Sequence, residues 1–213
     1  MKIGILGTGR VGSTIAGRLA ELGHDVMIGS RDPSSKQDLV VKLGGKTKVG
    51  TMLEAAKYGE ILFNTVPGRT TLETLTAIGE ANISGRVLVD VANVMDFSHG
   101  TPPTLLVANT DSLAEEIQRT FPKTRVVKAL NTLGFTLMTH PENLAKGDHS
   151  IFVCGNDAFA KTQVSELLAS FGWKQIYDLG DIRSARGMEM YLVFRSEVSA
   201  ALGNAPFNIK IVH

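Results

Sequence analysis

The first twelve residues constrain this chain most, because they join a short apolar run to a closely spaced set of glycines. Residues 2–6 (KIGIL) are followed at once by Gly7, Gly9 and Gly12 in the spacing G-x-G-x-x-G, and then by an amphipathic segment that reaches Leu22. Between a strand and a helix this spacing is a dinucleotide-binding fingerprint: the glycines permit a tight turn, close approach of a pyrophosphate and close helix packing. The free N–H groups of the first helical turn then face the anion. A glycine turn that only packs a helix is the alternative.

The end of the second expected strand (residues 25–28) indicates which dinucleotide binds. An Asp or Glu there accepts hydrogen bonds from the ribose 2′-OH of NAD and repels a 2′-phosphate. This chain has Ser30 and Arg31 instead, with Lys36 one turn further on as a candidate second cation. A guanidinium binds phosphate with a permanent charge and planar donors. The pattern favours NADP(H) over NAD, and Asp32 is expected to belong to the turn that opens the next helix. A solvated surface charge is the alternative role for the two cations.

Charge and cysteine content narrow the class of protein. The chain has 22 Lys and Arg against 21 Asp and Glu, without a basic stripe, so no nucleic-acid partner is expected. The single cysteine, Cys154, can form no intrachain disulfide, which fits a reducing compartment. No apolar run approaches the roughly twenty residues that span a bilayer, and the N-terminus reads as a strand. We therefore expect a soluble, cytoplasmic protein with no membrane partner, and the absence of metal-ligand motifs predicts no metal site.

Apolar runs alternate with segments of helical period along the chain, which predicts an α/β fold. We expect a Rossmann-type, doubly wound, mostly parallel sheet, with residues 1–179 as the NADP-binding domain and 180–213 as a small C-terminal helical extension. A final helix is expected over 182–202. Its apolar side chains lie on more than one face, which predicts a homodimer; burial within one subunit is the alternative. The expected strands are 2–6, 25–28, 48–49, 61–65, 87–90, 125–128, 150–153 and 174–177.

Four loops that follow expected strands carry amides and hydroxyls but few ionisable groups. They are residues 64–68, 91–93, 129–132 and 155–157. Ligands of such sheets bind outside the carboxyl ends of the strands, so these loops are expected near a nicotinamide. No His or Lys stands where it would protonate a carbonyl, and the five histidines fall at turns, in loops or at the terminus. We therefore assign no catalytic side chain: direct hydride transfer to another ring system requires chiefly positioning.

Several stretches together resemble the coenzyme F-420-dependent NADP reductases and their bacterial relatives. They are KIGILGTGRVGSTIAGRLAELGHDVMIGSRDP, NTVPG, VDVAN, VVKALNT and ALGNAPFNIKIV, which span nearly the whole chain. The resemblance implies a homodimer that exchanges hydride between NADP(H) and a deazaflavin. It also implies that residues 8–11 surround the pyrophosphate and that Val66 and Pro67 lie toward the ribose and nicotinamide. The complete predicted cofactor-binding set is Gly7, Thr8, Gly9, Arg10, Val11, Gly12, Ser30, Arg31, Lys36, Thr65, Val66, Pro67, Ala92, Asn93, Asn131 and Thr132.

The second substrate stays open in the sequence. The segment Asn131-Thr132-Leu133-Gly134 is more similar to the reductase domain of the six-transmembrane metalloreductases than to the archaeal F-420-dependent NADP reductases. The resemblance to the metalloreductases implies hydride transfer from NADPH to a flavin. The acceptor is therefore expected to be coenzyme F-420, FAD, FMN or another compound. Two other functions remain: a non-catalytic NADPH-binding redox sensor, and an NADPH-dependent reductase of a small imine or carbonyl compound. The latter calls for a larger helical substrate domain than the residues after Gly180 provide.

Overall fold

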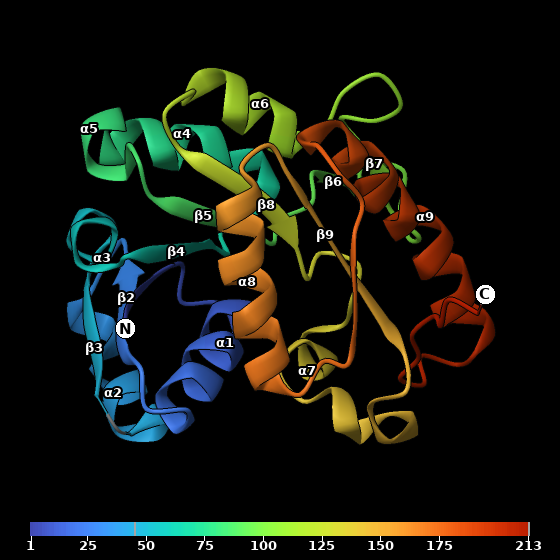
Figure 1. Cartoon of the computed structure of the whole chain (residues 1–213), viewed down its shortest axis with the longest axis horizontal. Helices are drawn as coiled ribbons and strands as arrows, with labels where there is room; N and C mark the ends of the chain where they lie inside the picture. Colours follow the sequence, from blue (N-terminus) through green and yellow to red (C-terminus); the bar gives the residue numbers. More distant parts are fainter. Residues whose placement is uncertain (45, 213) are drawn as a thin grey trace.

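Eight strands form one sheet in the order β10-β9-β8-β5-β4-β1-β2-β3 in the computed structural model, which describes residues 1–44 and 46–212 (Figure 1). Their apolar side chains are buried on both faces, as in a parallel sheet covered by helices. The strands are β1 (Lys2–Leu6), β2 (Asp25–Ser30), β3 (Thr47–Thr51), β4 (Ile61–Asn64), β5 (Val87–Asp90), β8 (Arg125–Ala129), β9 (Ser150–Gly155) and β10 (Gln175–Asp178).

Strand direction divides the sheet into two parts. The six strands from β3 to β8 pair in parallel, and the order reverses between β1 and β4, so the carboxyl ends of these strands share one edge. β9 then pairs antiparallel with β8, and β10 runs parallel to β9. The predicted doubly wound, mostly parallel sheet is confirmed. The reversal of β9 moves its carboxyl end to the opposite edge.

Helices cover both faces of the sheet (Figure 1). One face packs against α1 (Arg10–Glu21), α7 (Phe135–Met138) and α8 (Ala158–Phe171), with Ile15 and Val164 in its core. On the other face, Leu75, Ile117 and Met188 lie in a second core. The helices of that face are α3 (Met52–Tyr58), α4 (Gly68–Ile78), α5 (Glu80–Ile83), α6 (Leu113–Thr120) and α9 (Ala185–Ala201), while α2 (Gln37–Leu43) lies beside α1 and β3.

Short elements that the sequence pattern did not predict lie between the main ones. β6 (Met95–Asp96) and β7 (Thr104–Leu105) form a small antiparallel pair. The expected helix over 182–202 begins as a 3-10 turn and continues as α9. The other 3-10 turns are η1 (Ser34–Lys36), η2 (Pro141–Asn143) and η3 (Ala145–Gly147), and the one before α9 is η4 (Ile182–Ser184). No helix among the described residues is long and apolar enough to cross a membrane.

After α9 the chain returns to the start of β9. The Ser150 amide donates to the Ile209 carbonyl at 2.9 Å, and Asn208 Nδ2 donates to the Ser150 carbonyl and to His149 Nδ1, both at 2.8 Å. His149 lies in the loop before β9, as expected; it is buried there and makes an edge-on ring contact with Trp173 at 4.9 Å. Residues 208–211 are thus held against the start of β9. The division into domains at 179–180 stays a prediction.

Candidate dinucleotide and hydride-acceptor site

The glycine turn has the geometry that its three positions require. Gly7 has φ +123°, a conformation that L side chains rarely adopt. A Cβ on Gly12 would lie 2.2 Å from the Gly7 carbonyl oxygen, so the helix can begin here only with glycine at this position. Apart from Gly9 itself, its two chain neighbours and the backbone of its own helix, no described atom lies within 4 Å of a Cβ built on Gly9. The space above Gly9 and the N-terminus of α1 is therefore open to a pyrophosphate, and the residues present fit a dinucleotide.

The end of β2 forms a turn beside two unpaired cations. Ser30 is buried, and its Oγ accepts a hydrogen bond from the Asp32 amide at 3.1 Å. Asp32 Oδ1 in turn accepts from Ser34 Oγ and the Ser35 amide, and these hydrogen bonds lower the pKa of that carboxyl. Asp32 therefore belongs to the turn, as its sequence context indicated. Within residues 1–44 and 46–212, neither Arg31 nor Lys36 forms an ion pair, so the charge of Arg31 is available directly after Ser30 and that of Lys36 at the end of η1.

The loop after β4 packs against the glycine turn on one side. Thr65 Oγ1 donates to the Leu6 carbonyl at 2.9 Å, and a Cβ on Gly7 would lie 2.9 Å from the same hydroxyl. Val66 is buried and Pro67 is exposed where α4 begins. These contacts place Thr65 directly beside the glycine turn, and Val66 and Pro67 follow it in the chain.

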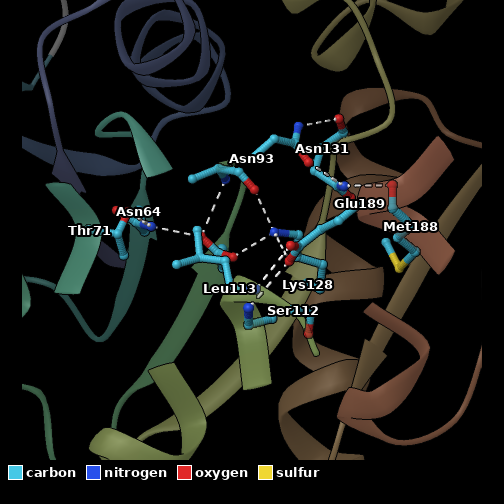
Figure 2. Close-up of polar contacts among 12 residues, drawn as sticks. Asn64, Thr71, Asn93, Ser112, Leu113, Lys128, Asn131, Met188 and Glu189 are labelled. Carbon is cyan, nitrogen blue, oxygen red and sulfur yellow. Dashed lines mark hydrogen bonds and ion pairs between the residues drawn. The ribbon is translucent and has the colours of Figure 1, made fainter. Parts of the chain in front are cut away.

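The loops after β4, β5 and β8 are joined to one another. A Cβ on Gly68 would lie 2.4 Å from the Asn93 carbonyl oxygen, which leaves no room for a side chain. Asn93 Nδ2 donates to the Asn131 carbonyl at 3.0 Å, and Asn131 Nδ2 donates to Asn93 Oδ1 at 3.1 Å and to the Met188 carbonyl of α9 at 3.0 Å (Figure 2). Thr132, the next residue along the chain after Asn131, is also buried. The preceding residue, Leu130, has φ +65°, and such backbone conformations concentrate at functional sites.

Arg10 of the glycine turn contacts the loop after β8. Its guanidinium carbon lies 5.3 Å from the ring centroid of Phe135, within the range of a cation–π contact. Contacts therefore run from the glycine turn through the loops after β4, β5 and β8 and back to Arg10. We call residues 7–10, 65–68, 92–93 and 131–135 the strand-edge rim. The sequence-based prediction did not include Phe135. The available signal was an aromatic residue directly after the segment NTLG (residues 131–134).

A buried ionic network lies beside the rim. Lys128 Nζ is 2.7 Å from Asp90 Oδ2 and 2.8 Å from Glu189 Oε1, and all three side chains are at most 2% exposed (Figure 2). Burial by itself lowers the pKa of Lys128, but the two carboxylates outweigh it and raise that pKa. Lys128 Nζ also donates to the Ala92 carbonyl at 2.5 Å, which fixes the loop that carries Asn93. Sequence analysis missed this network, although a lysine inside the apolar run VVKAL was a signal for it.

Further hydrogen bonds extend this network to neighbouring elements. Asn64 Nδ2, at the end of β4, donates to Asp90 Oδ1 at 2.7 Å. Glu189 of α9 accepts from the Leu113 and Ala114 amides at 3.0 and 3.3 Å, so it caps α6 from another helix. The N-terminus of α6 partly offsets the excess negative charge of the network. One set of buried polar groups thus connects β4, β5, β8, α6 and α9 beside the rim.

The loop at residues 155–157 does not join the rim, contrary to our expectation. Because β9 is antiparallel to β8, this loop lies beside the start of β8 at the opposite edge of the sheet. Asp157 accepts from the Ala160 amide at 2.8 Å and caps α8, while Asn156 Oδ1 accepts from the Ile182 amide at 3.1 Å. The residues of this loop are therefore capping and turn residues.

Histidines and other potential metal ligands are dispersed. Burial lowers the pKa of His24, at the turn between α1 and β2. His140 Nδ1 lies 3.1 Å from Glu142 in an exposed pair. Across residues 1–44 and 46–212, no three His, Cys, Asp or Glu side chains are grouped so that they could hold a metal ion.

The fold and the strand-edge rim define a Rossmann-type dinucleotide-binding oxidoreductase, and comparison with known proteins narrows this class. The family model for NADP oxidoreductases that are coenzyme F420-dependent matches residues 2–94. The F420-dependent NADP reductase of Methanocaldococcus jannaschii is 30% identical over 200 residues, which cover 89% of this chain and 88% of the relative. A crystal structure of a candidate F420-dependent NADP reductase from Arthrobacter sp. FB24 is 48% identical, with a TM-score of 0.96 and full coverage of both chains.

The chain therefore belongs to the F420-dependent NADP reductase family, which confirms the resemblance found in the sequence. It is also 31% identical over 189 residues to the rat metalloreductase STEAP3. That match covers 88% of this chain and 36% of the relative, so the chain spans about a third of the length of the metalloreductase. The similarity to a metalloreductase segment is thus confirmed as well.

Proposed function

We propose that the chain transfers hydride between NADP(H) and a deazaflavin, coenzyme F420, or a flavin. The observation that carries this proposal is the closed strand-edge rim, which borders the open space above Gly9 and presents amides, a hydroxyl and an arginine. Three ionisable side chains next to the rim, Lys128, Asp90 and Glu189, are buried and paired with one another. Such a site supplies positioning and exclusion of water, which is what direct hydride transfer requires of a protein.

The cofactor end of this proposal rests on the cations beside Ser30. Arg31 and Lys36 would hold the 2′-phosphate of NADP(H), and the N-terminus of α1 would receive the pyrophosphate. When bound, the nicotinamide supplies or accepts the hydride. The rim residues Asn93 and Asn131 already hold each other in place, so the strand-edge amides are preorganised before any ligand arrives.

The proposal includes a homodimer built partly on α9. Met190, Phe194 and Leu202 are large apolar side chains exposed to 38%, 60% and 50% on and just after this helix. A second copy of the chain would bury them. Light scattering at micromolar concentration tests this point: we expect twice the mass of one chain, and a monomer would contradict the homodimer without affecting the hydride-transfer proposal.

The direct test mixes the purified chain with NADPH and with F420, FMN or FAD in the absence of oxygen. We expect at least one of these acceptors to accelerate the loss of NADPH absorbance well above the rate without protein. The matched control is the Gly9→Ala variant, in which a methyl group occupies the open space of the turn. Tight NADPH binding without acceleration by any of the three acceptors would contradict hydride transfer and favour a redox-sensing role.

A further inference from the structure

Arg195 occupies an unusual position on α9. Its guanidinium Nη2 lies 3.0 Å from the point where a Cβ on Gly134 would stand, so it lies against the rim loop that follows β8. On its other side the guanidinium carbon is 5.5 Å from the ring centroid of Phe207, in the segment that returns to β9. The side chain is half-buried and held between two segments far apart in sequence. Glycine at position 134 is what leaves room for it.

This guanidinium has no counter-charge. In the part of the chain that the structure describes, no carboxylate pairs with Arg195 and no hydrogen bond to it is formed. Two other arginines close to α9 differ: Arg183 pairs with Asp181 and Arg186 with Glu115. Burial lowers the pKa of Arg195, because desolvation disfavours its charged form. An anion at this position would restore the missing partner.

A second unpaired donor stands one helical turn earlier. The Tyr191 hydroxyl is buried and finds no hydrogen-bond partner among the described residues. Residues four apart share a face of a helix, so the Tyr191 and Arg195 side chains are neighbours on α9. A buried hydroxyl without a hydrogen-bond partner destabilises the folded chain. Two adjacent donors that lack acceptors therefore point to a ligand with oxygen acceptors and negative charge.

The location separates this group from the predicted dinucleotide contacts. Gly134 and Phe135 are consecutive: Arg195 lies against Gly134, while Arg10 of the glycine turn lies over the ring of Phe135. The two guanidinium groups thus contact neighbouring residues of one loop, one from α1 and the other from α9. Arg10 belongs to the dinucleotide turn, which leaves Arg195 for the second substrate.

We propose that Arg195 and Tyr191 bind an anionic group, a phosphate or a carboxylate, of the hydride acceptor. This inference rests on the proposed function and makes it more specific: the acceptor is a flavin-type molecule that carries negative charge outside its ring system. A neutral ring compound would leave the Arg195 charge without a partner and would be used less efficiently.

The test compares FMN with riboflavin, because the two share one ring system and differ in a phosphate. With NADPH as donor and without oxygen, we expect kcat/KM for FMN to exceed that for riboflavin by about tenfold or more, the range for loss of a charge-assisted contact. Arg195→Leu removes this preference by lowering kcat/KM for FMN alone, and Arg195→Lys retains part of it. Tyr191→Phe produces a smaller loss of the same kind. NADPH affinity stays within about twofold in all three variants, because loss of a uniform binding contact at the acceptor does not reach the cofactor.

Controls and a binding measurement keep the two proposals separate. Arg183→Leu removes a paired arginine just before α9 and is expected to leave the FMN preference unchanged; thermal melting checks that each variant folds. Equal use of FMN and riboflavin by the wild-type chain overturns the anion subsite and leaves hydride transfer standing. If no acceptor is reduced, hydride transfer fails, and calorimetric titration of FMN and riboflavin into the NADP⁺ complex decides the subsite. Tighter FMN binding that Arg195→Leu abolishes supports it; equal affinity, or no binding of either, overturns it.

Discussion

Lys128 and Asp90 face each other 2.7 Å apart in the interior, and neither side chain is exposed to solvent. The pair joins the last residue of β5 to the penultimate residue of β8, and Lys128 also donates to the Ala92 carbonyl of the rim. A buried pair of this kind contributes little over an apolar substitute, but removal of one partner leaves a charge in the interior. Its importance here lies in the fixed position of the loop that carries Asn93.

Replacement of Lys128 by Met should therefore destabilise the chain strongly. Asp90 and Glu189 would lose their shared cation, and we expect the free energy of unfolding to fall by about 3–5 kcal/mol in urea titrations. The triple variant K128M/D90N/E189Q removes all three charges and should recover much of that loss. Lys46→Met, in an exposed pair with Asp25 at 3.6 Å, is the control and should cost at most about 1 kcal/mol. A similarly small effect of Lys128→Met would contradict this account.

Arg31→Ala should weaken NADPH binding by about tenfold or more and leave NADH binding nearly unchanged, because the guanidinium would contact only the 2′-phosphate. Calorimetry with both dinucleotides measures the two affinities. Lys57→Ala removes an exposed cation near the opposite ends of the strands and should alter neither. Equal affinities of the wild-type chain for NADPH and NADH would show that the cations beside Ser30 do not select the cofactor.

Two glycine substitutions should separate folding from binding. A methyl group on Gly12 would overlap the Gly7 carbonyl, so Gly12→Ala should lower thermal stability as well as dinucleotide affinity. A methyl group on Gly9 meets no described atom, so Gly9→Ala should keep its melting temperature within a few degrees but lose dinucleotide affinity. Unchanged affinity in a folded Gly9→Ala protein would place the pyrophosphate elsewhere.

Asn131→Ala should slow turnover by about ten- to a hundredfold through misplacement of the rim, the range that small positional errors cost. The variant loses the bonds to Asn93 and Met188, so single-turnover rates should fall more than NADPH affinity. Asn82→Ala removes a remote side-chain bond to the Ile78 carbonyl and serves as the control.

Alanine at His24, His99 or His140 should leave the single-turnover rate within about threefold. Loss of hydride transfer in one of these variants, with NADPH still bound, would indicate general acid–base catalysis.

The α6 carboxylate Glu115 should contribute stability that depends on pH. Arg186 donates to it at 2.8 and 2.6 Å and Ser112 Oγ at 2.8 Å, and these bonds hold the pKa of Glu115 below its ordinary value. A lowered folded-state pKa means that the stabilisation is present above the unfolded pKa, about 4.3, and disappears as pH falls through the folded value. Glu115→Gln should therefore be less stable at pH 7, by about 1–3 kcal/mol, with the difference shrinking below about pH 4. Exposed Glu166→Gln should show no such trend; a difference independent of pH would contradict the assignment.

Local patterns in the sequence were sufficient for most of the sheet. Residues 2–6, 87–90 and 125–128 are apolar runs between turn residues and helical periods, and each lies in a strand whose bounds differ by at most one residue. The glycine spacing and the Ser30-Arg31 pair were equally local, so the dinucleotide turn could be predicted in detail. The resemblance to a family added the expected substrate class. The comparisons confirm membership of that family, and the substrate class stays a proposal.

The direction of β9 and the buried network were not local properties. The run SIFVC is apolar whichever way the strand runs, so the loop at 155–157 was placed at the wrong edge. Lys128 and Glu189 are 61 positions apart in the sequence, and only the packing of α9 against β8 brings them to 2.8 Å. The same holds for Arg195, which meets Gly134 and Phe207 only in the folded chain. Charge complementarity over such separations is decided by tertiary packing.

Because β9 is reversed, the dinucleotide turn and the proposed acceptor subsite come from different parts of the sequence. Because β9 starts at the edge where β8 ends, the segment that returns after α9 docks there, at Ser150, next to the loop that contains Gly134. The turn for the dinucleotide is encoded before residue 70, whereas Arg195, Phe207 and their surroundings are encoded after residue 130. Substitutions confined to Tyr191, Arg195 and Phe207 could therefore change the proposed acceptor subsite while the glycine turn and the cations after β2 keep their sequence.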